Sequence, residues 1–210
     1  DHRDLHSFPT RRSSDLYEWS FMGFDFKVGR GVLIPRDDTE VVVNLCIDFL
    51  ENRTDKKTVD LCSGSGAIAV ALDKISGAEV TAVEIDETAF SYLETNVKEN
   101  NSSVKPVMAD ALEICETFAD GELDLIVSNP PYIKSADIET LQKEVRLEPR
   151  LALDGGKDGY DFYREIVSRW SRKLKKGGAL AFELGENQAD AVKALMAEQG
   201  FSDFKISLDF

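Results

Sequence analysis

The architecture of this chain can be inferred outward from residues 58–66, which read Thr58-Val59-Asp60-Leu61-Cys62-Ser63-Gly64-Ser65-Gly66. An apolar run passes into a glycine-rich turn, and apolar residues at helical spacing follow over 67–75. This order predicts a strand, a tight turn and a helix. Glycines let the backbone come close to a ligand, and the helix N-terminus offers free N–H groups and the positive end of a dipole. The segment therefore predicts a site for a nucleotide-like ligand.

Two further predicted strands lead to acidic residues. The apolar stretch 80–83 is followed by Glu84, about 20 residues after the glycine turn. The stretch 104–108 is followed by Asp110. A carboxylate at the first place can accept from both hydroxyls of a ribose, and one at the second can accept from an adenine amino group. Either carboxylate alone could be a solvated loop residue, but their occurrence at successive strand ends favours a nucleoside site.

A further predicted strand, 123–128, runs into Asn129-Pro130-Pro131-Tyr132. Proline fixes its own φ and keeps the preceding residue out of the helical region, so two prolines hold this turn open. The Pro130 carbonyl and the Asn129 side chain can then accept from an NH₂ group. Tyr132 adds a flat apolar face. A plain strand-to-loop turn is the alternative, but the neighbouring motifs favour a site for a planar nitrogen substrate.

Strands and helices alternate along the chain, which predicts a single α/β domain with a mostly parallel sheet and ligands at its carboxyl edge. The 210 residues are 42% hydrophobic, enough for one sizeable core. Helices are expected over 38–51, 67–75, 87–100, 160–175 and 187–199, and further strands over 24–28, 179–182 and 204–208. The basic residues over 169–176 are interpreted as the end of a helix, before a chain reversal at Gly177 and Gly178.

Composition excludes several other functions. The formal net charge is −14, which argues against a surface that follows a phosphate backbone and against free DNA or RNA as substrate. The three cysteines, Cys46, Cys62 and Cys115, are widely spaced and predict reduced cytoplasmic thiols without a metal cluster. The only histidines, His2 and His6, lie near the N-terminus, so histidine-dependent triads and zinc sites are not expected. No apolar run approaches the ~20 residues of a membrane span.

The order of these motifs resembles that of the S-adenosylmethionine-dependent class I methyltransferases, whose fold is Rossmann-like, with a mostly parallel central sheet and helices on both faces. That superfamily usually has glycine where Cys62 stands. Blocks at 33–40, 148–159 and 183–188, together with the Asn-Pro-Pro-Tyr turn, resemble the HemK/PrmC family. Its members are protein glutamine N5-methyltransferases that modify the glutamine of the Gly-Gly-Gln loop in class 1 peptide chain release factors. The resemblance covers about residues 23–210.

The resemblance implies S-adenosylmethionine as cofactor, no metal, and in-line attack of a glutamine side-chain nitrogen on the cofactor's methyl carbon. It assigns catalysis to Asn129, Pro130 and Tyr132, and substrate binding to these three with Pro131, Arg36 and Glu40. It assigns the cofactor site to Asp60, Cys62, Gly64, Ser65, Gly66, Glu84, Ile85, Asp110, Ala111 and Asn129. The family usually has aspartate at the place of Glu84. Arg36 could instead form a structural salt bridge to Glu148 or Asp154, and Glu183 could either support the pocket or pack behind it.

Residues 1–16 lack periodic apolar residues and are interpreted as a non-native or disordered leader, and residues 17–210 as the catalytic domain. The family normally begins with a small helical domain and ends with a last antiparallel strand. By resemblance, we expect both to be missing here. The expected partner is a class 1 release factor, with no direct nucleic-acid or membrane partner, a monomeric state and a cytoplasmic location.

Three alternatives stay open. An adenine-N6 DNA methyltransferase would also use an Asn-Pro-Pro-Tyr turn, because a flipped adenine offers a conjugated NH₂ group. Acidic charge and the lack of a recognition domain argue against it. A glutamine methyltransferase acting on a ribosomal protein is a closer alternative, although the Leu-Ile-Pro-Arg block at 33–36 favours release factors. The third is a catalytically silent scaffold, against which the intact turn motifs argue.

Overall fold

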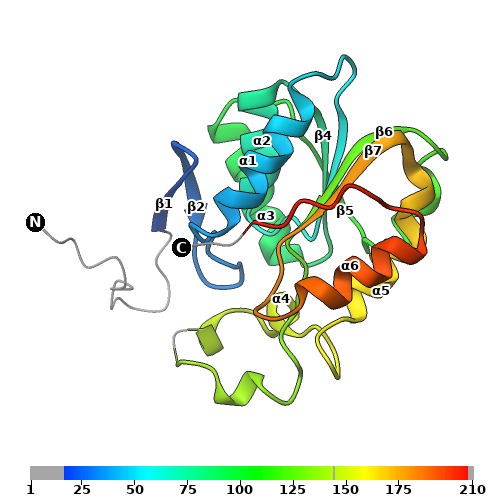
Figure 1. Cartoon of the computed structure of the whole chain (residues 1–210). Helices are drawn as coiled ribbons and strands as arrows, with labels where there is room; N and C mark the ends of the chain where they lie inside the picture. Colours follow the sequence, from blue (N-terminus) through cyan, green and yellow to red (C-terminus); the bar gives the residue numbers. More distant parts are fainter. Residues whose placement is uncertain (1–16, 144, 208–210) are drawn as a thin grey trace, which may run out of the picture.

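A computed structural model describes residues 17–143 and 145–207 (Figure 1). The expected leader, 1–16, lies outside the described residues. The strands are β1 (Tyr17–Phe21), β2 (Phe24–Val28), β3 (Lys57–Leu61), β4 (Glu79–Glu84), β5 (Lys105–Met108), β6 (Leu123–Ser128) and β7 (Leu174–Phe182). The α-helices are α1 (Thr39–Leu50), α2 (Ala67–Ser76), α3 (Glu87–Glu99), α4 (Arg150–Leu153), α5 (Asp161–Trp170) and α6 (Ala189–Glu198).

The central sheet has the strand order β5-β4-β3-β6-β7, and every neighbouring pair is parallel. The register places Leu61, the last residue of β3, opposite Val83 on one side and Ser128 on the other. The turns that follow β3, β4 and β6 therefore meet at one edge of the sheet. Open parallel sheets bind their ligands at this carboxyl edge. The predicted α/β, Rossmann-like fold is confirmed.

Alternating residues of the inner strands face two separate cores. Val80 and Ala82 of β4 pack into a core with α1, α2 and α3. Val83 of the same strand packs into a second core with α5, as does Ile126 of β6. Helices thus cover both faces of the sheet, with α1, α2 and α3 on one side and α5 and α6 on the other (Figure 1).

An antiparallel hairpin of β1 and β2 precedes the sheet, and one of its links to the rest of the fold is a buried amide. The Asn96 side chain of α3 accepts from the Lys27 backbone N–H at 2.7 Å and donates to the Lys27 carbonyl at 3.0 Å. It also donates to the Ser65 carbonyl in the glycine turn at 2.9 Å. Strand β2 matches the prediction, whereas β1 was not predicted. Asn96 therefore connects the hairpin to the turn that the ligand would approach.

Two predictions for the C-terminal third are wrong in part. The helix expected over 160–175 ends at Trp170, and β7 begins at Leu174 and continues through Gly177 and Gly178. A bulge in the pairing with β6 accommodates this irregular stretch. Lys175 lies in the strand and bonds Asp124 of β6 at 2.7 Å, so these basic residues belong to the sheet as well as to the end of a helix.

The strand expected over 204–208 is also wrong for its described part, because 204–207 have no regular structure. These residues follow α6 beside β7 without joining the described sheet, whose order ends at β7. Residue 208 lies outside the described range. No helix in the described part of the chain is long and apolar enough to cross a membrane.

Candidate active site

A cavity of about 260 Å³ lies at the carboxyl ends of β3, β4 and β6. Its walls come from the glycine turn, the ends of β4 and β5, the turn after β6, and two segments distant in sequence. The cavity is lined by Gly31, Val32, Leu33, Pro35, Thr39, Cys62, Ser63, Gly64, Ser65, Ala67, Ile68, Val83, Glu84, Ile85, Asp86, Ala89, Ala109, Asp110, Ala111, Leu112, Asn129, Pro131, Pro149, Leu151, Ala152 and Phe162. It thus brings most of the predicted cofactor residues together with Asn129.

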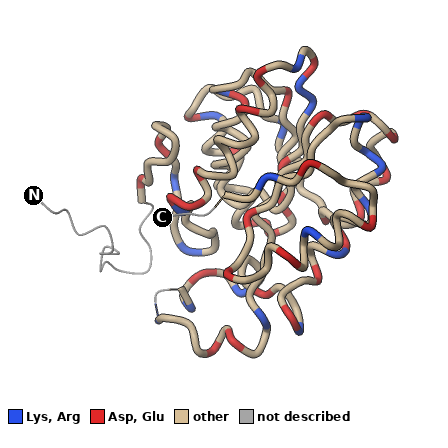
Figure 2. Tube along the Cα trace, in the orientation of Figure 1, with Lys and Arg blue, Asp and Glu red and all other residues tan. Residues whose placement is uncertain are grey.

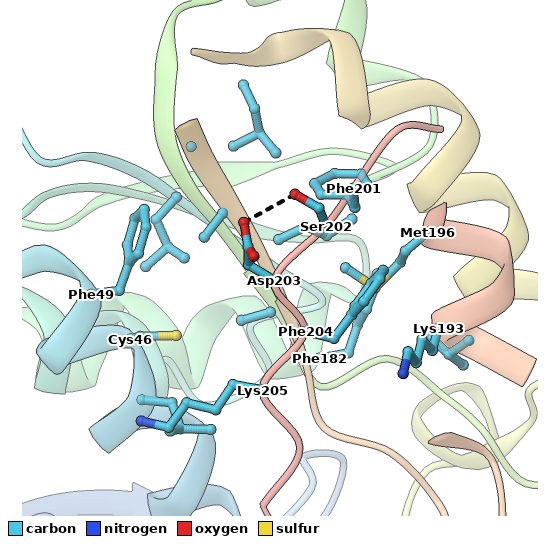
Figure 3. A pocket seen from close by; sticks show the side chains of 18 of the residues that line it. Cys46, Phe49, Phe182, Lys193, Met196, Phe201, Ser202, Asp203, Phe204 and Lys205 are labelled. Atoms are coloured by element: carbon cyan, nitrogen blue, oxygen red, sulfur yellow. Dashed lines mark hydrogen bonds between the residues drawn. The ribbon is translucent and has the colours of Figure 1, made fainter. Parts of the chain in front are cut away.

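A larger cavity of about 800 Å³ lies beside β7, between α1, α6 and the segment 199–206 (Figure 3). Cys46 and Phe49 of α1 lie on one side of it, and Met196 and Phe204 lie on the other. It contains none of the residues at the ends of β3, β4 and β6 that the sequence singles out. We therefore take the smaller cavity as the candidate site.

The glycine turn has a left-handed backbone at three places: Cys62 (φ 58°), Gly64 (φ 54°) and Gly66 (φ 83°). A side chain at this φ costs roughly 1–2 kcal/mol, which explains why glycine usually stands where this chain has Cys62. Gly66 also has no room for a side chain, since a Cβ there would lie 2.4 Å from Cδ1 of Leu93. Cys62 and Gly64 line the cavity, whereas Gly66 lies behind it.

Glu84 is almost buried and accepts three backbone N–H groups, each at 2.8 Å. Its Oε2 accepts from Gly64, and its Oε1 accepts from Ile85 and Asp86. One side chain therefore joins the glycine turn to the segment after β4. A carboxylate oxygen can accept two hydrogen bonds, so Oε2 keeps one acceptor position for a ligand.

Asp60 lies behind the glycine turn and does not line the cavity. Its carboxylate is fully buried, and within the described residues neither oxygen has a hydrogen-bond partner of good geometry. Burial raises the pKa of Asp60 to about 8, against a smaller lowering by the nearby Ser63 hydroxyl and Ala69 N–H. An unpartnered buried carboxyl next to a ligand-binding turn suits a cationic ligand group on the cavity side.

The wall opposite the glycine turn carries Ile85, Asp110 and Ala111, which all line the cavity. We call the part of the site formed by the glycine turn and the ends of β4 and β5 the inner half, and the part around the turn at 129–132 the outer half. Oδ1 of Asp110 accepts the N–H of Leu112 at 2.7 Å, which holds the carboxylate at the start of the turn after β5. Ile85 is 50% exposed, unusual for a large apolar side chain inside a concave site. Together they present an apolar surface next to a hydrogen-bond acceptor, which suits an adenine ring.

Three glycines from later in the chain lie too close to the turn at 129–132 to carry a side chain. A Cβ on Gly155 would lie 2.7 Å from Cα of Tyr132, and one on Gly159 would lie 2.5 Å from the Tyr132 carbonyl oxygen. A Cβ on Gly185 would lie 2.9 Å from Cδ2 of the Tyr132 ring. We call Gly155, Gly159 and Gly185 the glycine cradle. It explains why blocks far apart in sequence accompany the Asn-Pro-Pro-Tyr turn.

Within this turn, Asn129 and Pro131 line the cavity, whereas Pro130 and Tyr132 are not among the lining residues. Tyr132 is half-buried, and burial raises the pKa of its hydroxyl to about 12. Its carbonyl accepts from Nε2 of Gln188 at 3.1 Å. The turn thus offers the Asn129 amide to the cavity and anchors its other end on the segment after β7.

The residues of the 33–40 block divide between the site and its support. Arg36 forms an ion pair with Glu148 at 2.5 Å, the salt bridge that the sequence left open. Asp154 instead bonds Ser135 at 2.5 Å. Glu40 accepts from the Met22 backbone N–H at 2.8 Å, and neither Arg36 nor Glu40 lines the cavity. The structure therefore places both beside the site rather than in contact with the space a substrate would fill.

Comparison with known proteins agrees with this geometry. Residues 36–147 match the family model described as "Methyltransferase small domain". The chain is 40% identical over 195 residues to the release factor glutamine methyltransferase of Clostridium acetobutylicum, covering 90% of this chain and 68% of that protein. It belongs to the release factor glutamine methyltransferase family. The resemblance in the sequence motifs is thereby confirmed.

Other relatives of the same name are those of Geobacter sulfurreducens, 44% identical over 87% of this chain, and Fusobacterium nucleatum, 38% identical over 93%. The chain spans 63% and 55% of the lengths of these two proteins. Among solved structures, a methyltransferase from Pyrococcus furiosus is similar with a TM-score of 0.67 and 23% identity, covering 89% of this chain and 83% of that one. This likeness shows the fold.

Several lining residues of this family member were not predicted from its sequence. The loop with Gly31, Val32 and Leu33 and the segment with Leu151 and Ala152 enclose the cavity from outside the βα units. Leu33, Leu151 and Ala152 lie in the blocks that carry the family resemblance, but nothing in the sequence showed that their apolar side chains face a cavity. Thr39 was not assigned to the site from the sequence, yet it is buried and lines the cavity. Its place in the 33–40 block was the one clue that the sequence offered.

Proposed function

We propose that this chain transfers a methyl group from S-adenosylmethionine to the side-chain amide nitrogen of the glutamine in the Gly-Gly-Gln motif of class 1 peptide chain release factors. The observation that carries the proposal is that one cavity joins the Glu84 and Asp110 end to the Asn129 amide. Membership of the release factor glutamine methyltransferase family supports the same activity.

The residues of the inner half fit S-adenosylmethionine. When bound, it supplies a methyl group made electrophilic by a sulfonium. The free acceptor position of Glu84 would take the ribose hydroxyls, and Ile85 and Asp110 would hold the adenine. The buried Asp60 carboxyl, behind Cys62 and the glycine turn, would favour the cationic end of the cofactor. Gly64 lines the cavity and allows close approach because it has no side chain, and Ser65 lines the cavity next to it.

The outer half fits a primary amide. Its nitrogen is a poor nucleophile because the lone pair is delocalised into the carbonyl. We assign to the Asn129 side-chain oxygen and the Pro130 carbonyl the task of accepting both N–H hydrogens, which orients the NH₂ group and favours its developing positive charge. Tyr132 would supply a flat face beside the amide, and Pro131 keeps the turn open.

Positioning would supply much of the remaining rate. Well-oriented reactants can gain roughly 7–11 kcal/mol over free reactants, so attack needs no dedicated base and the proton can leave afterwards. The lining beyond the turn is largely apolar, with Leu33, Leu151 and Phe162 on the walls. Such walls limit water next to the reacting nitrogen.

The partner side of the proposal is a class 1 release factor. Lys and Arg are scattered over many elements among more numerous Asp and Glu (Figure 2). That distribution is unfavourable to a nucleic-acid partner and so to the adenine alternative. A monomeric state is part of the proposal, and a cytoplasmic location follows from the proposed substrate rather than from the fold.

The test is transfer of labelled methyl from S-adenosylmethionine to a purified class 1 release factor, to the same factor with its Gly-Gly-Gln glutamine replaced, to ribosomal proteins and to duplex DNA. We expect label only on the release factor that keeps its Gly-Gly-Gln glutamine. Label on DNA or on a ribosomal protein would replace the proposed substrate. Asn129→Ala should abolish turnover but leave cofactor affinity, measured by calorimetry, within about threefold of the unaltered chain.

A further inference from the structure

The segment after β7 places Glu183 next to the Asn-Pro-Pro-Tyr turn at 129–132. The Glu183 backbone N–H donates to the Ser128 carbonyl at 3.1 Å, which continues the β6–β7 ladder one residue past the strand. The Glu183 carbonyl accepts from the Tyr163 hydroxyl at 2.9 Å. With its backbone held on both sides, Glu183 is fixed beside Asn129, the residue that follows Ser128.

Two side chains that line the cavity, those of Thr39 and Asn129, lie near the Glu183 carboxylate, whereas Glu183 itself does not line it. The Thr39 hydroxyl donates to Oε2 at 2.5 Å, across 144 positions of sequence. The Asn129 side chain lies near the same carboxylate, and hydrogen bonding from it acts to lower the pKa of Glu183. Thr39 is only 3% exposed, so this contact forms in a buried environment where hydrogen-bond direction matters most.

The direction of the Asn129 bond follows from chemistry. An ionised carboxylate has no hydrogen to donate, so the bond to Glu183 must be donated by the NH₂ group of Asn129. A carboxamide is planar and has its NH₂ and oxygen on different sides. If the NH₂ is engaged by Glu183, the oxygen is the group left for the cavity. Thr39 strengthens this arrangement, because its donated bond favours the ionised form of Glu183.

We propose that Glu183, supported by Thr39, is a positioning residue that fixes the Asn129 carboxamide with its oxygen toward the substrate. The inference rests on the proposed function, in which that oxygen accepts an N–H of the substrate amide. A flipped Asn129 would present its NH₂ to another NH₂, and two donors cannot bond. Glu183 therefore decides whether the turn can hold a primary amide, although it does not touch the substrate.

The positioning of Asn129 depends on the charge state of Glu183. Burial raises the pKa of Glu183, and the bonds from Thr39 and Asn129 lower it. Asp38 acts in the raising direction and Arg36 in the lowering direction, both from the segment before α1. The hydroxyls of Tyr132, on the catalytic turn, and Tyr163, on α5, also face it. A protonated Glu183 could donate to Asn129, so the orientation would be lost as the pH falls through this pKa.

The kinetic test uses Glu183→Gln, which keeps size and shape but can either donate or accept. We expect kcat for release-factor methylation to fall about 10- to 100-fold, while KM and cofactor affinity stay within about threefold. The kcat of the unaltered chain should also fall at low pH, and this acid limb should be absent from Glu183→Gln. Thr39→Val should move the acid limb to higher pH, and Thr39→Ser should restore it.

The matched control is Glu186→Gln, the same change at an exposed carboxylate three residues on, which should leave kcat and its pH profile unchanged. A Glu183→Gln variant that folds normally and keeps the unaltered kcat and acid limb would overturn the proposal. A rise in KM with an unaltered kcat would also overturn it, because the orientation of Asn129 is expected to act on the reacting complex and not on substrate binding.

A second measurement needs no turnover and separates this proposal from the proposed function. In a chain with ¹⁵N-labelled asparagine, the Asn129 NH₂ signals are identified by their loss in Asn129→Ala. We expect them to be protected from exchange at neutral pH, and to shift in Glu183→Gln but not in Glu186→Gln. If they do so in a chain that methylates nothing, the positioning pair stands and the proposed function fails. Unshifted signals would refute the pair whatever the activity.

Discussion

Replacement of Glu84 by glutamine tests how the site joins its glycine turn to its ligand. The carboxylate bonds the N–H groups of Gly64, Ile85 and Asp86, all at 2.8 Å. In Glu84→Gln the remaining oxygen can stay on Ile85 and Asp86, but the new NH₂ group then faces the N–H of Gly64. Two donors meet, and a buried N–H loses its partner. This costs about 1–3 kcal/mol of unfolding free energy.

Cofactor affinity should fall as well. The acceptor position of Oε2 assigned to the ribose hydroxyls becomes a donor, and a hydrogen bond to a charged group contributes about 1.5–3 kcal/mol. The dissociation constant for S-adenosylmethionine should therefore rise about 10- to 150-fold. Both effects come from one atom, so a stability loss without an affinity loss would show that Oε2 serves the turn alone.

The assay is denaturant unfolding without ligand, together with calorimetric titration of S-adenosylmethionine at fixed pH. Glu87→Gln is the control, because it makes the same change at an exposed position in the first turn of α3. It should change neither quantity by more than about 0.5 kcal/mol. An unaltered dissociation constant in Glu84→Gln would refute the assignment of Glu84 to the cofactor.

Three further changes probe other parts of the site. The pKa of Asp60 is raised to about 8 from an ordinary value near 4, so the folded chain holds this proton more tightly than the unfolded chain, and stability falls as pH rises between these values. Asp60→Asn should accordingly stabilise the ligand-free chain at pH 8 by up to several kcal/mol and do so little at pH 4, as measured by urea unfolding; an equal effect at both would contradict the raised pKa. Asn96→Ala should cost about 2–4 kcal/mol, because three buried backbone groups lose their partner, whereas Thr95→Ala on the exposed side should cost under about 1 kcal/mol in the same unfolding assay. Gly155→Ala should lower both stability and turnover, because its Cβ meets backbone atoms of Tyr132, while Gly121→Ala, strained in φ but open in space, should lower only stability; normal turnover in a folded Gly155→Ala chain would exclude a role for the cradle.

The inner half of the site could be predicted because it depends on local order in the chain. Residues 58–66 form the strand end and turn that their sequence indicates, and the ends of β4 and β6 lie beside it because parallel strands pair in register. Glu84, which the sequence places at the end of a strand next to the turn, lines the cavity. Its three bonds to backbone N–H groups were not expected, since they depend on how two turns approach each other in space.

The outer half depends on contacts between distant segments. Thr39 is the first residue of α1 and its hydroxyl bonds Glu183, 144 positions away, so only the packing of α1 against the end of β7 brings the two together. Strand β7 was predicted too short for a similar reason. Lysines and glycines over 175–178 have little preference for strands, and they lie unpaired at the register shift between the pairs Leu123–Leu174 and Leu125–Ala179. Strand β1 is a short hairpin arm whose pairing with β2 is all that defines it.

The glycine cradle also limits how this domain can be recombined. Residues 155, 159 and 185 come from two separate segments, but a methyl group added at any of them would collide with Tyr132. A chimaera can take the Asn-Pro-Pro-Tyr turn from one protein and the region from 150 to 188 from another. Its two parts must then fit backbone against backbone, because the glycines at the contact have no side chain that could change conformation to relieve a poor fit. Crossovers before β6 keep turn and cradle together and should yield active hybrids far more often than crossovers between them.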